Sequence, residues 1–478
     1  MERIITQITV KVVDKILKNI EKNGISEIGK TAESFLNILK DGALEMLSAV
    51  VESVDTAILQ TKKERRKDGI TVKQRNVSRT VITSIGELTY KRTYYKQENG
   101  SMIYLTDHII GVEPFERVSK ELCAELVQKA ASMSMQKVVN VSNVAVSRQT
   151  VNNKVLSMHN AVTEIVNARS TPKEIHIFAD EDHVHLRPKR SAIVPIVTIT
   201  EGIDISNEKR HKTIEPIHFQ GYGMNTHSFV ENVVSAIHQK YDMDKVERVI
   251  IHADGGKWIK ILGELLPNAV FVMDGFHLEK YFKKLFKLNG AAAYGGVIHK
   301  AVKNNDFESF AVYCNSIKEK QDETGLKKLF ELVNYFQNNW DSIVERMNGN
   351  HCGSCTEPLV SHVLSDRLSR NPLAWSKEGL AKMAMLRVFE KNGGKVTSKH
   401  IRISRSKSER NEDYHSLKNG FEIYNKYAEQ QIKSSFGNYH DWSIFEKEYF
   451  PSGFSSGKVT GTSVLLNACS HFSSKYFF

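Results

Sequence analysis

Apolar and polar residues alternate with different periods in different parts of the chain, and each period predicts a kind of element. From residue 1 to about 60, apolar residues recur every three or four positions, which predicts helices for packing or dimerisation. Between Val77 and Tyr104 the period becomes two, and Ile85-Gly86-Glu87 links two β-rich runs, so we expect a β-hairpin. Residues 116–160 return to the helical period.

The segment after residue 172 predicts a mixed sheet. Apolar runs indicate five strands, with helices near 228–240 and from Lys257 onward; the strands are expected at 174–186, 192–200, 213–220, 246–252 and 269–273. Three strands in succession, followed by alternating helix and strand, is the order of a ribonuclease H-like fold. Residues 278–350 lose strand character and predict a helical insertion.

The expected fold class is therefore α/β, with a ribonuclease H-like catalytic core whose mixed sheet has five strands and carries an all-α insertion. Between Lys391 and Arg410, seven Lys/Arg stand against one acid, which is typical of a flexible arm along phosphates. The predicted regions are an N-terminal helical region (1–68), a β-hairpin region (69–115), a helix-turn-helix DNA-binding region (116–168), the core's first part (172–277), the insertion (278–350), the core's last part (351–390), and a basic arm with the C-terminal region (391–478).

Composition and charge narrow the class of partner. The 478 residues are 41% hydrophobic and 25% charged, which is ordinary for a soluble globular protein. A formal net charge of +11 favours a polyanionic partner, and nucleic acid is the better candidate. No run approaches the roughly 18–20 apolar residues of a membrane span, the N-terminus does not resemble a secretory signal, and five cysteines argue against a disulfide framework. We expect a cytoplasmic protein.

A candidate DNA-reading helix follows Ser147, which is a good N-cap residue. Two short helices, a small turn and this third helix fit a helix-turn-helix, although any three-helix bundle with a polar outer face would look similar. The side-chain types that reach bases and phosphates occur on this helix, in the turn between the first two strands, after the fourth strand and in the basic arm: Arg148, Gln149, Asn152, Lys154, Arg187, Lys189, Arg190, Lys257, Arg402 and Arg405.

Three acidic residues stand where predicted strands and helices meet. Asp180 follows an apolar run inside the first strand, Asp254 follows the fourth, and Glu357 precedes a helix. A carboxylate inside a core strand is costly unless it is paired or binds a metal. In a ribonuclease H-like order these side chains converge, and three carboxylates suit two Mg²⁺ ions, or Mn²⁺, about 4 Å apart.

Alternatives exist for each acidic position. Asp182 lies on the same strand face as Asp180, about 7 Å further along, and is the other candidate for the first metal ligand. Asp180 is favoured because it directly follows the apolar run and should be the more deeply buried of the two. Asp254 is also a possible helix cap, and Glu357 is expected at a cap, outside regular helix.

A further acid and a histidine, Asp274 and His277, end the fifth strand. They form either a hydrogen-bonded structural pair or a support that orients a ligand or phosphate.

The chain resembles the ISLre-type (UPF0236-like) family of bacterial insertion-sequence transposases, relatives of the Mutator-like DDE transposases. The resemblance implies an acidic triad at Asp180, Asp254 and Glu357, and it places the wider group's aspartate/cysteine-x-x-histidine signature on Asp274 and His277. The segments that carry it are the hairpin with Tyr104–Ser119, the helix-turn-helix, ADEDHVHL, HADGGKWI, FVMDGFHLEKY and EPLVSHVLSDRLSRNP.

This resemblance implies a DDE-type transposase that cleaves DNA at terminal inverted repeats and joins the freed 3′-hydroxyl to target DNA, with no covalent enzyme–DNA intermediate. The implied partners are double-stranded DNA, at the element ends and the target, and further copies of the chain on DNA at the bacterial nucleoid. No membrane and no small-molecule cofactor is expected. The alternatives are an inactive or domesticated transposase that acts as a DNA-binding regulator, and a structure-selective nuclease.

Overall fold

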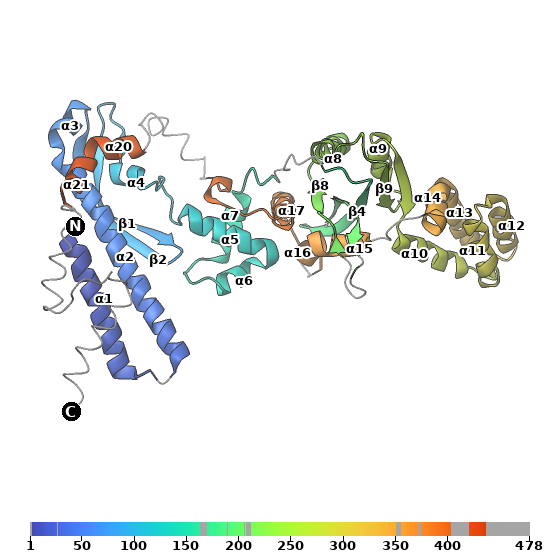
Figure 1. Cartoon of the computed structure of the whole chain (residues 1–478), viewed down its shortest axis with the longest axis horizontal. Helices are drawn as coiled ribbons and strands as arrows, with labels where there is room; N and C mark the ends of the chain where they lie inside the picture. The colour runs from blue at the N-terminus through green and yellow to red at the C-terminus, as the bar shows by residue number, and fades with distance from the viewer. Residues whose placement is uncertain are drawn as a thin grey trace. The chain divides into compact units, whose positions relative to one another are not determined.

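The chain is a mixed α/β protein in two compact units, here seen in a computed structural model (Figure 1). Unit 1 comprises residues 1–81, 86–115 and 410–478, and unit 2 comprises residues 82–85 and 116–409. The structure describes residues 2–25, 27–162, 170–188, 190–204, 206, 212–349, 355–370, 374–402 and 420–435. No helix in these ranges is long and apolar enough to cross a bilayer.

Unit 1 is built on a long helical hairpin that packs against a small sheet, as the two periods predict. Helices α1 and α2 pack together, and α2 covers β2 of a three-stranded sheet in the order β1-β2-β3. Its elements are α1 (Glu2–Asn23), α2 (Ile28–Gln60), α3 (Lys62–Lys67), β1 (Thr71–Thr83), β2 (Gly86–Lys96), β3 (Met102–Ile103), α4 (Leu105–Ile109), α20 (Gly420–Tyr427) and α21 (Glu429–Ser435).

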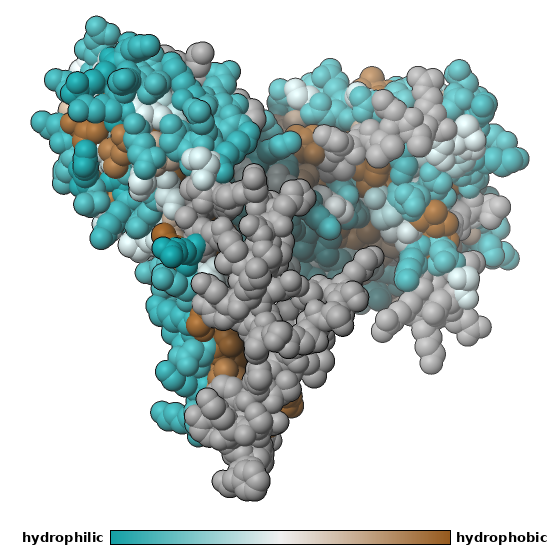
Figure 2. Space-filling view, turned by 60° about the vertical axis from the view of Figure 1, so that its left-hand side comes forward, coloured by the Kyte–Doolittle hydropathy of each residue, from teal (hydrophilic) through white to brown (hydrophobic). Residues whose placement is uncertain are grey.

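The α1–α2 hairpin keeps apolar side chains at its surface. Figure 2 shows brown patches along this hairpin, where it points downward in the view. The exposed apolar residues on the two helices include Val10, Val13, Leu36, Leu39 and Leu47. A row of this kind is typical of a helical surface that packs against a partner.

A buried carboxylate joins α2 to the sheet of unit 1. Asp55 is 7% exposed, and its Oδ1 accepts hydrogen bonds from the Thr93 backbone N–H at 2.8 Å and the Thr106 hydroxyl at 2.5 Å. Its Oδ2 accepts from the Thr93 hydroxyl at 2.7 Å. Because all these groups are buried, water cannot replace the carboxylate as their hydrogen-bond acceptor. Asp55 therefore fixes α2 on β2.

Removing this carboxylate should destabilise unit 1. We expect Asp55→Ala to lower the free energy of unfolding by about 3 kcal/mol, since several buried donors lose their acceptor. Urea unfolding of the full chain, followed by circular dichroism, measures the change. Asp14→Ala, which breaks an exposed ion pair with Lys18, is the control and should change it by less than about 0.5 kcal/mol. Equal effects of the two variants would contradict the role given to Asp55.

Unit 2 is organised around the five-stranded mixed sheet, whose order is β10-β9-β4-β5-β8. β4 pairs antiparallel with β5 and parallel with β9, and β9 pairs parallel with β10. The strands are β4 (Glu174–Leu186), β5 (Arg190–Thr200), β8 (Ile217–Gln220), β9 (Arg248–Ala253) and β10 (Ala269–Met273). The strand expected at 213–220 is shorter, because residues 212–213 form β7, which pairs with β6 (Ile203–Asp204) in a separate ribbon.

Helices cover this sheet and extend from it. Helices α8 (Thr226–Lys240) and α9 (Lys257–Glu264) bury the apolar side chains of β4, β5 and β9 in one core cluster. The insertion has its own apolar core, and it consists of α10 (Gly275–Phe286), η1 (Ala291–Tyr294), α11 (Gly295–Lys303), α12 (Phe307–Lys318), α13 (Glu323–Asn338) and α14 (Trp340–Asn348).

A second core cluster unites the candidate helix-turn-helix with the far end of β4 and β5. Its helices are α5 (Lys120–Ser132), α6 (Met135–Asn140), α7 (Arg148–Leu156), α15 (Thr356–Val360), a π-helical turn η2 (Ser361–Ser365), α16 (Asp366–Leu368) and α17 (Lys377–Lys391). The three-helix bundle therefore does not hang from a linker but shares its interior with the sheet.

The described part of the expected basic arm packs against the end of α7. After α17 the chain passes through the turn η3 (Ser398–His400), and Ile401 is buried in the same core. The His159 N–H donates to the His400 carbonyl at 2.9 Å, and the Arg402 N–H donates to the Ser157 carbonyl at 2.9 Å. Backbone pairing thus holds this segment along the end of α7.

Candidate active site

Three aspartates lie at the carboxyl ends of neighbouring parallel strands. In the register of β4 and β9, Phe178 pairs with His252, so Asp180 and Asp254 each lie two residues beyond that pair. In β10, Met273 pairs with Ala253, and the Asp274 N–H donates to the Ala253 carbonyl at 2.8 Å. Because β4 continues past the end of β9, Asp180 lies within its strand while the other two follow theirs.

The electrostatics of Asp180 record this convergence. Burial raises the pKa of its carboxyl to about 6, and the charges of Asp254 and Asp274 act in the same direction. The Glu181 N–H, which donates to Asp180 Oδ1 at 2.8 Å, and the imidazole of His277 act against that rise in pKa. Asp254, Asp274 and His277 therefore all lie close enough to act on the pKa of Asp180.

Asp274 and His277 form a hydrogen-bonded pair at the start of α10. Asp274 is the N-cap of this helix: its Oδ2 accepts from the N–H groups of Phe276 at 3.0 Å and His277 at 3.2 Å. The same oxygen lies 3.2 Å from His277 Nδ1, and this hydrogen bond is the main cause that raises the pKa of His277. The pair is structural, and it also directs the histidine toward the other carboxylates.

Asp254 begins a glycine turn rather than capping a helix. Its Oδ1 accepts from the Gly256 N–H at 3.0 Å, and Gly256 is the N-cap of α9. Gly255 has a φ of +92°, and a Cβ there would lie 2.5 Å from the Asn339 Oδ1. Glycine is thus required both by the backbone conformation and by the closeness of the insertion.

Asp182 faces different partners from Asp180. The Ser369 hydroxyl donates to its Oδ1 at 2.9 Å, and burial raises its pKa. At 6% exposure Asp182 is buried, whereas Asp180 is only half-buried, so the expectation that Asp180 is the more deeply buried residue is wrong. Glu181 points to the opposite face of β4, where it accepts from Trp258 Nε1 at 2.8 Å.

Glu357 lies on a helix that packs against β4. It is exposed and occupies the first turn of α15, one residue inside the helix, because Cys355 rather than Glu357 is at the N-cap. Glu357 and Asp274 line the same groove, together with Arg346. The structure thus places Glu357 in the lining of the same groove as the aspartate that caps α10.

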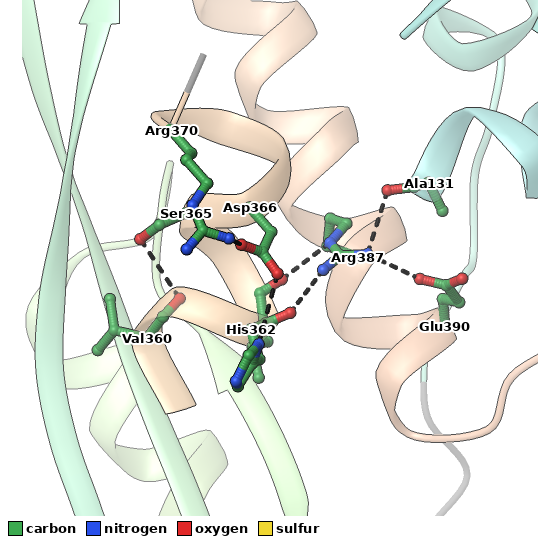
Figure 3. Close-up of polar contacts among 9 residues, drawn as sticks. Ala131, Val360, His362, Ser365, Asp366, Arg370, Arg387 and Glu390 are labelled. Atoms are coloured by element: carbon green, nitrogen blue, oxygen red, sulfur yellow. Dashed lines mark hydrogen bonds and ion pairs between the residues drawn. The ribbon is translucent and has the colours of Figure 1, made fainter. Parts of the chain in front are cut away.

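Two buried arginines hold the helical segment that contains Glu357 to the helix-turn-helix, and Figure 3 shows the contacts of one of them, Arg387. The guanidinium of Arg387 donates to the carbonyls of His362 at 2.6 Å and Val363 at 2.9 Å, in the π-helical turn, and to that of Ala131 at 3.2 Å. Arg367 Nε donates to the Ala130 carbonyl at 2.9 Å. Ala130 and Ala131 end α5, so the two arginines join α5 to the helical segment that begins with Glu357. No sequence pattern pointed to either arginine.

The donor set of this site suits a hard divalent cation. Carboxylate oxygens are the ligands that Mg²⁺ and Mn²⁺ prefer, and the burial and like charges that raise the pKa of Asp180 are relieved by a cation. Among the described residues, no three His, Cys, Asp or Glu side chains are placed so closely that they hold a metal together. Asp180, Asp254 and Glu357 are therefore not close enough in this structure to share one.

The residues expected to bind DNA fall into three places in unit 2. Ser147 caps α7 as predicted, with its hydroxyl accepting from the Thr150 N–H at 3.0 Å. On α7, Arg148 and Gln149 are exposed, while Asn152 and Lys154 are half-buried. The other exposed candidates are Arg402, which is hydrogen-bonded to Ser157 just after α7, Arg187 and Arg190 at the β4–β5 turn, and Lys257 at the start of α9. Lys189 and Arg405 lie outside the described residues.

Comparison with known proteins places the chain in a family. The model of an "Uncharacterised protein family (UPF0236)" matches residues 21–404. The chain belongs to the UPF0236 family. A UPF0236 protein from Caldanaerobacter subterraneus subsp. tengcongensis is 31% identical over 385 residues, 79% of this chain and 81% of the relative. Another from that organism is 33% identical over 356 residues, covering 73% and 76%, and one from Streptococcus gallolyticus is 22% identical over 394 residues, covering 77% and 86%.

The carboxylate cluster predicts that neutralising one acid stabilises this UPF0236 protein. Because the pKa of Asp180 is raised in the folded state, its ionisation removes stability as the pH rises from about 4 through 6. We expect Asp180→Asn to raise the melting temperature at pH 8, in the absence of divalent cations, and to have a smaller effect at pH 4. Scanning calorimetry at both pH values in EDTA measures this.

Mg²⁺ gives the same prediction a second readout. Added Mg²⁺ should raise the melting temperature of the wild type at pH 8 by more than that of Asp180→Asn, since the cation binds the folded carboxylates. An Asp180→Asn variant that is less stable than the wild type at pH 8 would contradict the strain assigned to this cluster.

Proposed function

We propose that this UPF0236 protein is a DDE-type transposase of a bacterial insertion sequence. The observation that carries the proposal is the convergence of Asp180 and Asp254 at the ends of β4 and β9, with the helix of Glu357 packed against β4. The proposed reaction is metal-dependent cleavage of DNA at terminal inverted repeats, followed by strand transfer into target DNA.

The strand order supports a ribonuclease H-like core. Numbered along the chain, the five strands lie in the order fifth, fourth, first, second, third, with the first three antiparallel and the last two parallel to the first. This is the arrangement expected for that core, and it brings the first and fourth strands side by side. The proposed relation to the Mutator-like enzymes rests on this arrangement together with Asp274 and His277.

The names of the relatives give independent support to the transposase proposal. One Caldanaerobacter relative has a name that joins eleven gene designations, and the name of another joins four. Repeated genes for one protein in one genome are what a mobile element leaves behind when it copies or moves itself. A regulator or a nuclease of the host does not require such multiplication.

The chain's own residues divide the proposed work. Asp180, Asp254 and Glu357 would hold the metal, and two Mg²⁺ ions bound there supply activation of the attacking oxygen and stabilisation of the leaving oxygen. Asp274 fixes the start of α10 and orients His277 toward the carboxylates. The helix-turn-helix would bind the element ends as double-stranded DNA, and the exposed apolar row of α1 and α2 would join copies of the chain on that DNA.

Cleavage and strand transfer test this proposal directly. With labelled DNA that carries the element's ends, Mg²⁺ and target plasmid, the wild type should give nicked and joined products on a sequencing gel. Asp254→Asn and Glu357→Gln should lower both products at least 100-fold, because each removes a charged metal ligand. Cleavage without any joined product would leave a nuclease and exclude a transposase.

The two candidate acids on β4 can be separated in the same assay. Asp180→Asn should lower the products at least 100-fold, whereas Asp182→Asn should keep them within about 10-fold, since its amide oxygen still accepts from the Ser369 hydroxyl. The variants are matched because they neutralise two acids on one face of one strand. The reverse result would make Asp182 the metal ligand.

The helix-turn-helix makes a separate prediction about binding. Arg148→Ala should weaken binding to the element's end by roughly 5- to 100-fold, as the loss of one base or phosphate contact does. Fluorescence anisotropy at several salt concentrations, with the end sequence and a scrambled duplex, measures affinity and specificity. Lys129→Ala on α5, which breaks a pair with Glu125, is the control. Equal losses in both variants would remove α7 from the DNA-binding surface.

A further inference from the structure

The groove between α10, α14 and α15 holds chemistry that cleavage alone does not use. Its volume is about 560 Å³, which is in the range of pockets for small ligands and far too small for a DNA duplex. Three carboxylates line it, beside two basic side chains, a histidine and an exposed aromatic ring: Asp274, Glu279, Glu357, Lys283, Arg346, His299 and Phe276. The basic side chains and the ring are the part of this lining that suits a ligand with negative charge and a flat apolar part.

Phe276 supplies the flat surface. It is 57% exposed, although it lies between Asp274 and His277 at the centre of the site. Its backbone is fixed, because its N–H donates to Asp274 Oδ2 at 3.0 Å. An exposed ring on a fixed backbone is the arrangement on which an unpaired nucleic-acid base stacks.

Basic groups lie beside and beyond this ring. Arg346 reaches over Gly275, where an added Cβ would lie 2.6 Å from its Nη2, so the glycine admits the guanidinium next to Phe276. Along α10, the exposed lysines Lys280, Lys283, Lys284 and Lys287 extend over about 10 Å. Among the described residues Lys280 and Lys287 form no ion pair. Lys283 forms a long, exposed ion pair, with its Nζ 3.7 Å from Glu279 Oε2. This row leads away from the carboxylates and suits successive phosphates.

We propose that this groove binds an unpaired DNA strand, with a base stacked on Phe276 and the following phosphates along the lysines of α10. The inference rests on the proposed function, because the unpaired strand is the one opened or freed at Asp180 and Asp254. Duplex DNA does not fit this role, since its base faces are already stacked within the helix. The basic groups along α10 supply the charge complementarity that a strand of phosphates requires.

Binding of a single strand without chemistry tests the inference. In the full-length Asp254→Asn protein with EDTA, a 3′-fluorescein 12-nucleotide strand should bind, as measured by anisotropy. Phe276→Ala should weaken this binding roughly 5- to 100-fold, the range for one base–aromatic stack, and Phe276→Trp should retain it. Lys280→Glu with Lys287→Glu should weaken it as well and reduce its salt dependence.

Matched controls come from the insertion itself. Phe330 on α13 is 54% exposed and lies 5.6 Å from the Nζ of Lys318, so it offers the same chemistry away from the groove. Phe330→Ala and Lys328→Glu should leave single-strand affinity unchanged. The inference is overturned if the strand does not bind, if Phe330→Ala weakens it as much as Phe276→Ala, or if Phe276→Ala weakens duplex binding equally.

The two proposals fail in different ways. Cleavage by the wild type without single-strand binding would remove only the role of the groove. Single-strand binding that depends on Phe276, without cleavage in any substrate, would remove only the transposase activity.

Discussion

Partly buried carboxylates gathered at the ends of β4, β9 and β10 are the constraint that the rest of unit 2 accommodates. The backbone stabilises part of this negative charge, since Asp180, Asp254 and Asp274 each accept a hydrogen bond from an N–H that follows them in the chain. The ring of His277 and the N-terminus of the helix that Asp274 caps also stabilise it. Burial, assisted by the charges of Asp254 and Asp274, raises the pKa of Asp180 to about 6. The ionised form of Asp180 thus destabilises the folded state at a place where a bound cation would stabilise it. Functional sites commonly lower the stability of a protein in this way.

The candidate DNA-reading helices and the carboxylate helix share one hydrophobic core with the far end of the sheet. Buried Arg367 and Arg387 are costly to desolvate, and burial lowers the pKa of Arg367 to about 10. Their guanidinium groups donate hydrogen bonds to carbonyls in the last turn of α5 and in the π-helical turn, which offsets part of this cost. Hydrogen bonds therefore link α5 to the π-helical turn that follows α15, and π-helical turns often accompany functional positions.

Sequence patterns located most of this architecture because the central strands carry runs of buried apolar residues. The bounds of β4 and β10 match the predicted strands, and the Ser147 cap and the hairpin also follow from local chemistry. The failures involve partners distant in the chain. Asp182 is buried because Ser369 lies against it, and the segment before Arg402 is ordered because His159 and Ser157 pair with it. Charge alone predicted a solvated arm there, and no local signal could reveal these contacts.

The same distinction between local and distant partners separates Asp274 and Glu357, two of the acids that line the groove. Asp274 follows β10 directly beside Asp254, but its Oδ2 already accepts from two backbone N–H groups and lies within hydrogen-bond distance of the His277 ring. An oxygen engaged in this way organises the site more readily than it coordinates a cation. Among the described residues, Glu357 makes no hydrogen bond or ion pair, and its side chain is exposed on a short helix. Under the proposed function, Glu357 is thus the acid left available to a cation, and Asp274 is the acid that builds the helix start.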